Sequence, residues 1–202
     1  MAPETWSAAL NLHGNSSDTT QKFVSEKYGF AFSPPAGWTV KLSLEPGYFS
    51  FVGKDDPQFG GHVSDLTELF PDSNCVQRWA QPKVTFKSLA ALHTPAFYEA
   101  RGDLGTASGR VDSVHEFTSP AGLEVVVVYV AQVFDFYEPD SVSAYNKQDQ
   151  HSFVVWIDIS HGGRCMALIF EPWESGYEPE KALVHTMDIV NSLTLIPFKD
   201  DK

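Results

Sequence analysis

The stretch "GRVDSVHEFTSPAGLEVVVVYVAQVFDFY", residues 109–137, decides the fold. Two runs rich in β-branched and aromatic residues flank the tetrapeptide "SPAG" at 119–122. Proline fixes its own φ and glycine adopts a positive φ at no steric cost, so this tetrapeptide predicts a tight turn between two antiparallel strands. In the second run both alternating sets of side chains are apolar, which is typical of a strand covered on both faces. We therefore predict that 123–133 is a central strand.

Alternating apolar residues recur on both sides of this hairpin, which predicts a mostly antiparallel sheet. The segments 152–160 and 165–170 form a second hairpin through the "HGG" turn at 161–163, and shorter strands are expected at 30–33, 38–44, 49–53 and 62–66. Apolar residues at helical spacing, with Pro179 in the first turn beside Glu178 and Glu180, predict an amphipathic helix over 179–193. The wet side of this helix is expected to carry Lys181, His185, Asp188 and Ser192. The sequence thus predicts an N-terminal tail, 1–21, and a single α+β domain, 22–198, with helices laid on a sheet. The polar residues "FKDDK" at the other end, 198–202, are also expected to be a tail.

Composition narrows the classes of partner. The 202 residues include 26 acidic and 14 basic side chains, a formal charge of −12, which repels a phosphate backbone and favours a protein partner over nucleic acid. The chain has no apolar run near the roughly 20 residues of a membrane helix. The first 21 residues lack the basic and apolar regions of a signal peptide, which fits a cytoplasmic protein or an exported one whose signal peptide is absent from this chain.

The two cysteines, Cys75 and Cys165, bear on the same question of compartment. A disulfide between them would indicate an oxidising compartment, whereas two separated thiols would leave the compartment open. Two given positions in a domain of this size are usually far apart, so we expect separation.

Two end segments carry a family resemblance. "YGFAFSPPAGW", residues 28–38, resembles the first hairpin of the superfamily that includes the PsbP extrinsic proteins of photosystem II and the Ran-binding Mog proteins, in which an aromatic strand reaches a proline turn and then a tryptophan. "MDIVNSLTL", residues 187–195, resembles the closing helix of those proteins. The resemblance implies an α/β/α sandwich and an accessory or binding protein rather than a catalyst. It carries no metal or partner site to named residues.

One acidic and aromatic segment is a candidate site. "DFYEPD", residues 135–140, is expected as a loop after the central strand. Its aromatic residues, with one further along the chain, are of the types enriched at protein interfaces, which makes Phe136, Tyr137 and Tyr145 candidate partner contacts. Its carboxylates suit a hard cation but lack the complete spacing of a calcium loop, so Asp135, Glu138 and Asp140 form an incomplete cation site. An ordinary packed loop is the third interpretation.

Catalytic motifs are weak. The sequence has no nucleophile elbow, phosphate-binding loop or zinc-protease motif, so we expect neither a cofactor nor catalysis. The preferred hypothesis is a non-catalytic binding or accessory protein, and the alternative is a hydrolase with an unrecognised carboxylate or histidine site. Four groups of histidine and carboxylate side chains are candidates for such a hydrolase site, and each also has a simpler interpretation as solvated or structural side chains. The groups are Asp112 with His115 and Glu116, His62 with Asp65 and Glu68, His151 with His161, and Glu171 with Glu174.

Overall fold

The computed structural model describes residues 22–53, 59–66, 108–137, 145–171 and 179–199. These residues form a seven-stranded sheet, in the order β3-β4-β5-β9-β8-β7-β6, and a three-stranded sheet, β1-β2-β10, in which neighbouring strands are antiparallel. The strands are β1 (Phe23–Ser25), β2 (Phe30–Phe32), β3 (Thr39–Leu42), β4 (Tyr48–Val52), β5 (Phe59–Asp65), β6 (Ser108–Thr118), β7 (Glu124–Tyr137), β8 (Tyr145–Asp158), β9 (Met166–Glu171) and β10 (Thr194–Leu195). The helix whose bounds fall within the described residues is α6 (Pro179–Ser192).

Both predicted hairpins are confirmed. Between β6 and β7, the Gly122 amide donates to the Ser119 carbonyl at 2.9 Å, and Gly122 has a φ of 80°. Between β8 and β9, Gly162 and Gly163 both have positive φ, 56° and 84°, and the Arg164 amide donates to the His161 carbonyl at 3.0 Å. Two consecutive positive φ values match the twist of the flanking strands, which is why "HGG" works as a hairpin turn.

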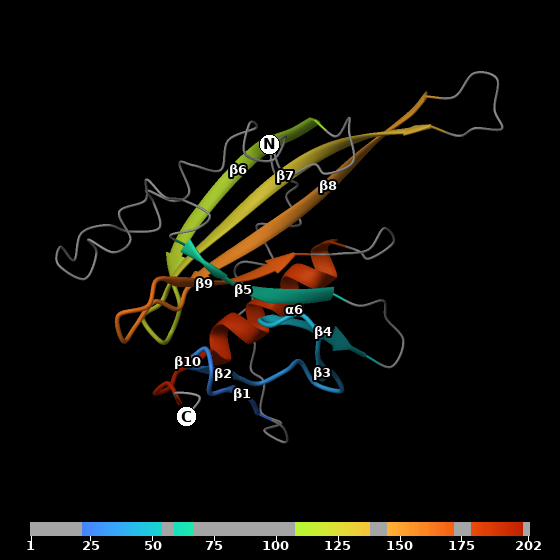
Figure 1. Ribbon diagram of the computed structural model, residues 1–202. Helices are drawn as coiled ribbons and strands as arrows, with labels where there is room; N and C mark the ends of the chain where they lie inside the picture. Colours follow the sequence, from blue (N-terminus) through green and yellow to red (C-terminus); the bar gives the residue numbers. More distant parts are fainter. Residues whose placement is uncertain (1–21, 54–58, 67–107, 138–144, 172–178, 200–202) are drawn as a thin grey trace.

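The main core lies between the seven-stranded sheet and α6, which contacts both β8 and β2. Figure 1 shows the helix between the large sheet and the small one. Apolar residues at helical spacing, among them Leu183 and Val190, are fully buried there against alternate residues of the central strands. The helix end is fastened to β2, because the Ser33 amide donates to the Ser192 hydroxyl at 3.0 Å. The predicted amphipathic helix is therefore confirmed.

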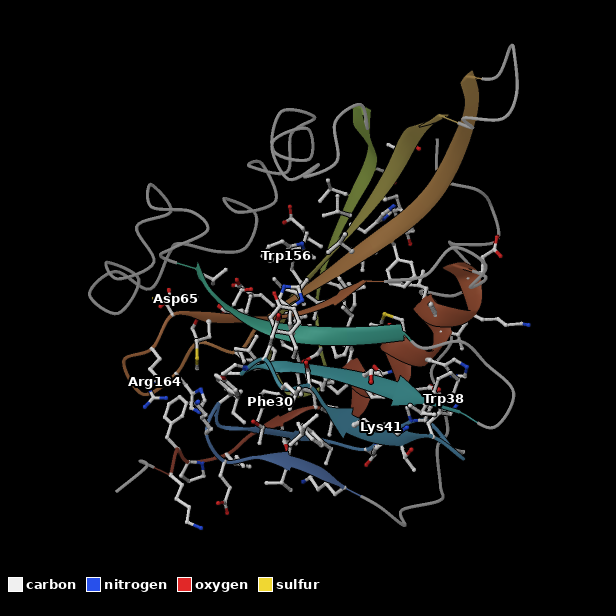
Figure 2. All side chains as sticks on the ribbon, turned by 45° about the vertical axis from the view of Figure 1, so that its right-hand side comes forward. Phe30, Trp38, Lys41, Asp65, Trp156 and Arg164 are labelled. Atoms are coloured by element: carbon white, nitrogen blue, oxygen red, sulfur yellow. The ribbon has the colours of Figure 1, made fainter. Side chains whose placement is uncertain are left out.

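The other face of the large sheet is buried as well. Val126, Val128 and Trp156 are at most 1% exposed, although they alternate with the residues that face α6. Figure 2 shows Trp156 and Phe30 on opposite sides of the β5 ribbon. The prediction that 123–133 is a strand covered on both faces is thus confirmed.

The predicted α/β/α sandwich is wrong. Within the described residues the fold is dominated by antiparallel sheet, and the helical layer formed by α6 lies on one face only. The helix covers one of the two sheet faces that the sequence pattern predicts to be buried. A pattern of buried alternate residues does not specify which kind of element covers the other face. The strands are also longer than expected: β7 and β8 have 14 residues each and rise together beyond the rest of the sheet (Figure 1).

Two further expectations are corrected. Residues 198 and 199 are not part of a polar tail, because the Phe198 ring stacks on His161 with a centroid distance of 4.2 Å and the Lys199 ammonium lies 2.9 Å from the Glu26 carboxylate.

Cys165 is disulfide-bonded, so the expectation of two separated thiols is wrong. The other cysteine of the sequence, Cys75, lies outside the described residues, as do residues 1–21 of the predicted tail.

Candidate functional site

A pocket of about 210 Å³ opens where the small sheet meets the edge of the large one. Its floor is formed by Phe30 and Phe49, which are almost fully buried, and its walls include the half-buried Phe23 and Tyr28. Phe23 lies between the two floor rings, with centroid distances of 6.2 Å to Phe30 and 5.7 Å to Phe49. We call this space the apolar pocket; its remaining lining residues are Ser25, Lys27, Leu42, Ser43, Glu45, Pro46, Gly47, Tyr48 and Val63.

A tight turn between β3 and β4 forms one wall of the apolar pocket. The Ser43 amide donates to the Tyr48 carbonyl at 2.9 Å, and the Tyr48 amide donates to the Glu45 carbonyl at 3.2 Å. Gly47 completes the turn with a φ of 89°, a conformation that side chains of L-residues rarely adopt. The Gly47 carbonyl then accepts from the Val63 amide at 3.1 Å, so the turn is held against β5. These hydrogen bonds fix the shape of the wall.

The mouth of the pocket is unusually apolar for a protein surface. Leu42, which lines the pocket, is 74% exposed, and Leu44 is fully exposed. Leu42 is the register partner of the buried Phe49 across β3 and β4, so it lies on the core-facing side of the sheet at the point where the core ends. Exposed large apolar side chains beside a pocket mark a binding surface more often than an isolated exposed leucine does.

The pocket has few polar groups, and its charged side chains include one of each sign. Lys27 and Glu45 are exposed at the pocket, and the Lys27 ammonium lies 5.5 Å from the centroid of the Tyr28 ring. Ser25 and Ser43 add hydroxyl groups. This lining selects an apolar group of moderate size and lacks a convergent set of acidic or histidine side chains among the described residues.

The predicted partner-contact residues lie elsewhere, at the far end of the β7–β8 hairpin (Figure 1). The strand β7 continues through Tyr137, so the segment 135–137 is strand and the expectation of a loop there is wrong. Tyr137 is the register partner of Tyr145, and Phe136 is the partner of Asn146. The backbone therefore places Tyr137 opposite Tyr145, whereas Phe136 belongs to the alternate set of β7 positions. The role of these residues in binding stays a prediction.

The candidate cation residues are only partly described. Asp135 lies on β7 with Lys147 as its register partner on β8. Glu138 and Asp140 lie outside the described residues. Within the part of the chain that the structure describes, no three acidic, histidine or cysteine side chains are grouped as metal ligands.

The histidine and carboxylate groups weighed for a hydrolase are spread over the sheet. His115 packs edge-on against the Tyr129 ring with a centroid distance of 5.4 Å, and a β-bulge between Val111 and Ser113 interrupts the alternation that would place Asp112 on the face of Glu116. His62 is buried and stacks on Tyr48 at 4.8 Å, while Asp65 is exposed. Glu68 and Glu174 lie outside the described residues, as do the side chains of His151 and Glu171.

A histidine and a carboxylate do come together on α6. His185 and Asp188 are one helical turn apart and half-buried rather than solvated, and the Trp38 ring lies 4.9 Å from that of His185. Burial raises the pKa of Asp188, and the neighbouring His185 opposes this rise. The sequence pattern assigned both side chains to the wet side of the helix and did not anticipate Trp38 there. Figure 2 shows Trp38 beside Lys41, on the side of the molecule away from Arg164.

The apolar pocket itself was not predicted from the sequence. Its walls come from three segments, 23–30, 42–49 and Val63, and sequence order alone does not bring them together. One signal was present: Leu42 and Leu44 flank a serine shortly before the Pro46–Gly47 turn, where solvated side chains are usual.

Comparisons with known proteins leave the family open. No known protein family matches the chain, and no curated protein matches it, so the resemblance to the PsbP and Mog proteins has no support from them. A crystal structure of a protein from Bacteroides thetaiotaomicron is similar over 91% of this chain and 50% of its own, at 11% identity and a TM-score of 0.30. The chain therefore spans about half the length of that protein, and a likeness this low carries no argument about function. Among the described helices, none has the length and apolar character needed to cross a membrane.

Proposed function

We propose that the protein is a non-catalytic binding module and that the apolar pocket receives an apolar side chain of a protein partner. The observation that carries this proposal is the pocket itself, which has aromatic walls and the exposed Leu42 in its lining, with the fully exposed Leu44 two residues further along the chain. Binding energy at protein interfaces is concentrated where one large side chain fills a desolvated pocket.

The size of the pocket favours a side chain over a free small molecule. Sites that enclose drug-sized ligands have volumes of roughly 300–1,000 Å³. The apolar pocket holds about 210 Å³, which suits one leucine or phenylalanine side chain. The exposed Leu42 and Leu44 would remain in water around a ligand that fills only the pocket, whereas a larger partner covers them and gains the free energy of their burial.

The charge of the chain favours a partner whose surface around the anchoring side chain is basic. A net charge of −12 raises the association rate with such a surface at low ionic strength. The disulfide at Cys165 supports an exported protein, because disulfides persist mainly in oxidising compartments.

Two variants of β1 test the proposal. Ser25 lines the pocket, whereas its neighbour Val24 alternates to the other side of the strand and is 50% exposed. Ser25→Trp places an indole in the pocket, and Val24→Trp adds the same side chain outside it. In affinity purification from the native source, we expect a protein that is retained by the wild type and by Val24→Trp and lost with Ser25→Trp. Identical sets of retained proteins for all three would contradict the proposal.

A further inference from the structure

The segment 196–199, which we call the C-terminal segment, packs against the turn between β1 and β2. The Ile196 amide donates to the Gly29 carbonyl of this turn at 2.8 Å. The same turn contributes Lys27 and Tyr28 to the lining of the apolar pocket. The contacts of the C-terminal segment therefore help to fix the position of one pocket wall.

His161 links the C-terminal segment to the hairpin between β8 and β9. Its Nε2 lies 2.9 Å from the Ile196 carbonyl oxygen, and its Nδ1 lies 2.8 Å from the Ile159 carbonyl oxygen. A carbonyl oxygen only accepts hydrogen bonds, so both ring nitrogens have to donate. A neutral imidazole has one N–H group, whereas an imidazolium ring has two. The hydrogen-bond geometry at His161 is therefore that of the charged ring.

We propose that His161 is a pH-sensitive latch, in which the charged ring holds the C-terminal segment against the β1–β2 turn and loss of its proton releases the segment. In the neutral ring, one nitrogen presents a lone pair to a carbonyl oxygen, and that contact becomes repulsive. The ring is then displaced in either tautomer. Because His161 stacks on Phe198 with a centroid distance of 4.2 Å, the displacement reaches the C-terminal segment directly.

The two hydrogen-bond partners of the His161 ring are backbone carbonyls, which do not titrate. The far end of the C-terminal segment is held independently, since the Lys199 ammonium lies 2.9 Å from the Glu26 carboxylate. Histidine ordinarily changes charge between pH 5 and 8, whereas aspartate, glutamate, tyrosine, lysine and arginine ordinarily keep one charge state over this range. The groups of these other types on the elements packed against His161 are Glu26, Lys27, Tyr28, Asp158, Arg164 and Lys199.

The wild-type protein provides the first measurement. Two-bond ¹H–¹⁵N nuclear magnetic resonance spectra distinguish an imidazolium ring from a neutral one, and at pH 5 we expect His161 to carry a proton on both nitrogens. Hydrogen exchange then follows the C-terminal segment. From pH 5 to pH 8 we expect the protection factors of the Ile196 and Lys199 amides to fall at least about tenfold relative to that of Val127 in the central strand β7, because a hydrogen bond to a charged group is lost.

Two phenylalanine variants assign this change to one histidine. His161→Phe keeps a flat ring beside Phe198 and removes the titrating group, so the protection of the Ile196 amide should be low at both pH values. His115→Phe is the matched control, because His115 also packs against an aromatic ring, that of Tyr129, and it should keep the wild-type response.

Three results would overturn the inference: a neutral His161 ring at pH 5, equal relative protection of the two amides at pH 5 and pH 8, or a response that His161→Phe leaves unchanged. The first two are measured on the wild type and do not require a variant to fold. All of these measurements use the protein without a ligand, so they are independent of the proposed function.

Discussion

Gly29 allows the sharpest test of the packing that supports the pocket. It has a φ of 71° and lies in the turn between β1 and β2, where a Cβ atom would stand 2.6 Å from the His161 ring and 2.8 Å from the Phe198 ring. The turn cannot retreat easily, because the Gly29 amide donates to the Ser25 carbonyl and the Gly29 carbonyl accepts from the Ile196 amide, both at 2.8 Å. Gly37 has a similar φ of 80°, but a Cβ atom there would meet nothing within 4 Å.

Alanine at the two positions therefore separates backbone strain from steric conflict. A left-handed alanine costs about 1–2 kcal/mol, of which the stiffer unfolded chain offsets about 0.4–1, so Gly37→Ala should lower the free energy of unfolding by about 1 kcal/mol. Gly29→Ala introduces the same backbone strain, and its new Cβ atom must also displace the His161 ring. That ring lies 2.9 Å from the Ile196 carbonyl oxygen through Nε2 and is stacked on Phe198. Loss of one hydrogen bond, one ring contact and well-packed neighbours adds about 2–3 kcal/mol.

Urea denaturation followed by tryptophan fluorescence measures both values, since the chain has five tryptophans. We expect Gly29→Ala to lose about 3 kcal/mol and to exceed Gly37→Ala by at least about 2 kcal/mol. Gly122→Ala is a second open control, with a φ of 80° and no neighbour within 4 Å. If Gly29→Ala and the two controls agree within about 0.5 kcal/mol, the inferred conflict with His161 and Phe198 is wrong.

Three further predictions concern titration and redox state. Burial raises the pKa of Asp188 above 3.8. The stability that this group contributes is therefore full below pH 3.8 and is lost as the pH rises through the folded-state pKa. Asp188→Asn should raise the urea midpoint of unfolding at pH 7 and leave it unchanged at pH 3. Burial raises the pKa of Tyr129 from 10.0 to about 12, so its contribution is full below pH 10 and is lost as the pH rises through about 12. Ultraviolet titration should show one tyrosine ionising late, absent in Tyr129→Phe, and a tyrosinate signal complete by pH 11 would contradict this. The disulfide at Cys165 predicts that reduction of the intact protein adds the mass of two hydrogens, and an unchanged mass would show free thiols.

The strand pattern was predictable from the sequence because side-chain alternation follows directly from strand geometry. The run Val125–Val128, with both parities apolar, identified β7 as covered on both faces, and the positive-φ residues Gly122, Gly162 and Gly163 marked the turns. The end of β7 was misplaced because the acidic and aromatic residues at 135–137 have no local feature that excludes either strand or loop.

The layers and the site were less predictable because both depend on contacts between distant segments. Phe198 was assigned to a tail, since one aromatic residue before "KDDK" has no periodicity, yet it packs between His161 and Arg164. The pocket joins residues from β1, β2, β3, β4 and β5, and the pair Leu42 and Leu44 was the one local indication of it in the sequence. Burial of residues on the second sheet face was predicted correctly, but the family resemblance wrongly implied helices on both faces.

The most direct test of the central claim is a titration of the apolar pocket with N-acetyl-L-phenylalaninamide, which presents a phenylalanine side chain without a partner protein. Methyl groups of leucine and valine are observed by nuclear magnetic resonance. We expect saturable shifts at Leu42 and Val63, which line the pocket, and none at Val126 and Val128, which are buried on the other face of the sheet. Ser25→Trp should abolish the shifts. Absent shifts at Leu42 and Val63 up to the solubility limit, or equal shifts at all four residues, would contradict the claim that this pocket receives an apolar side chain.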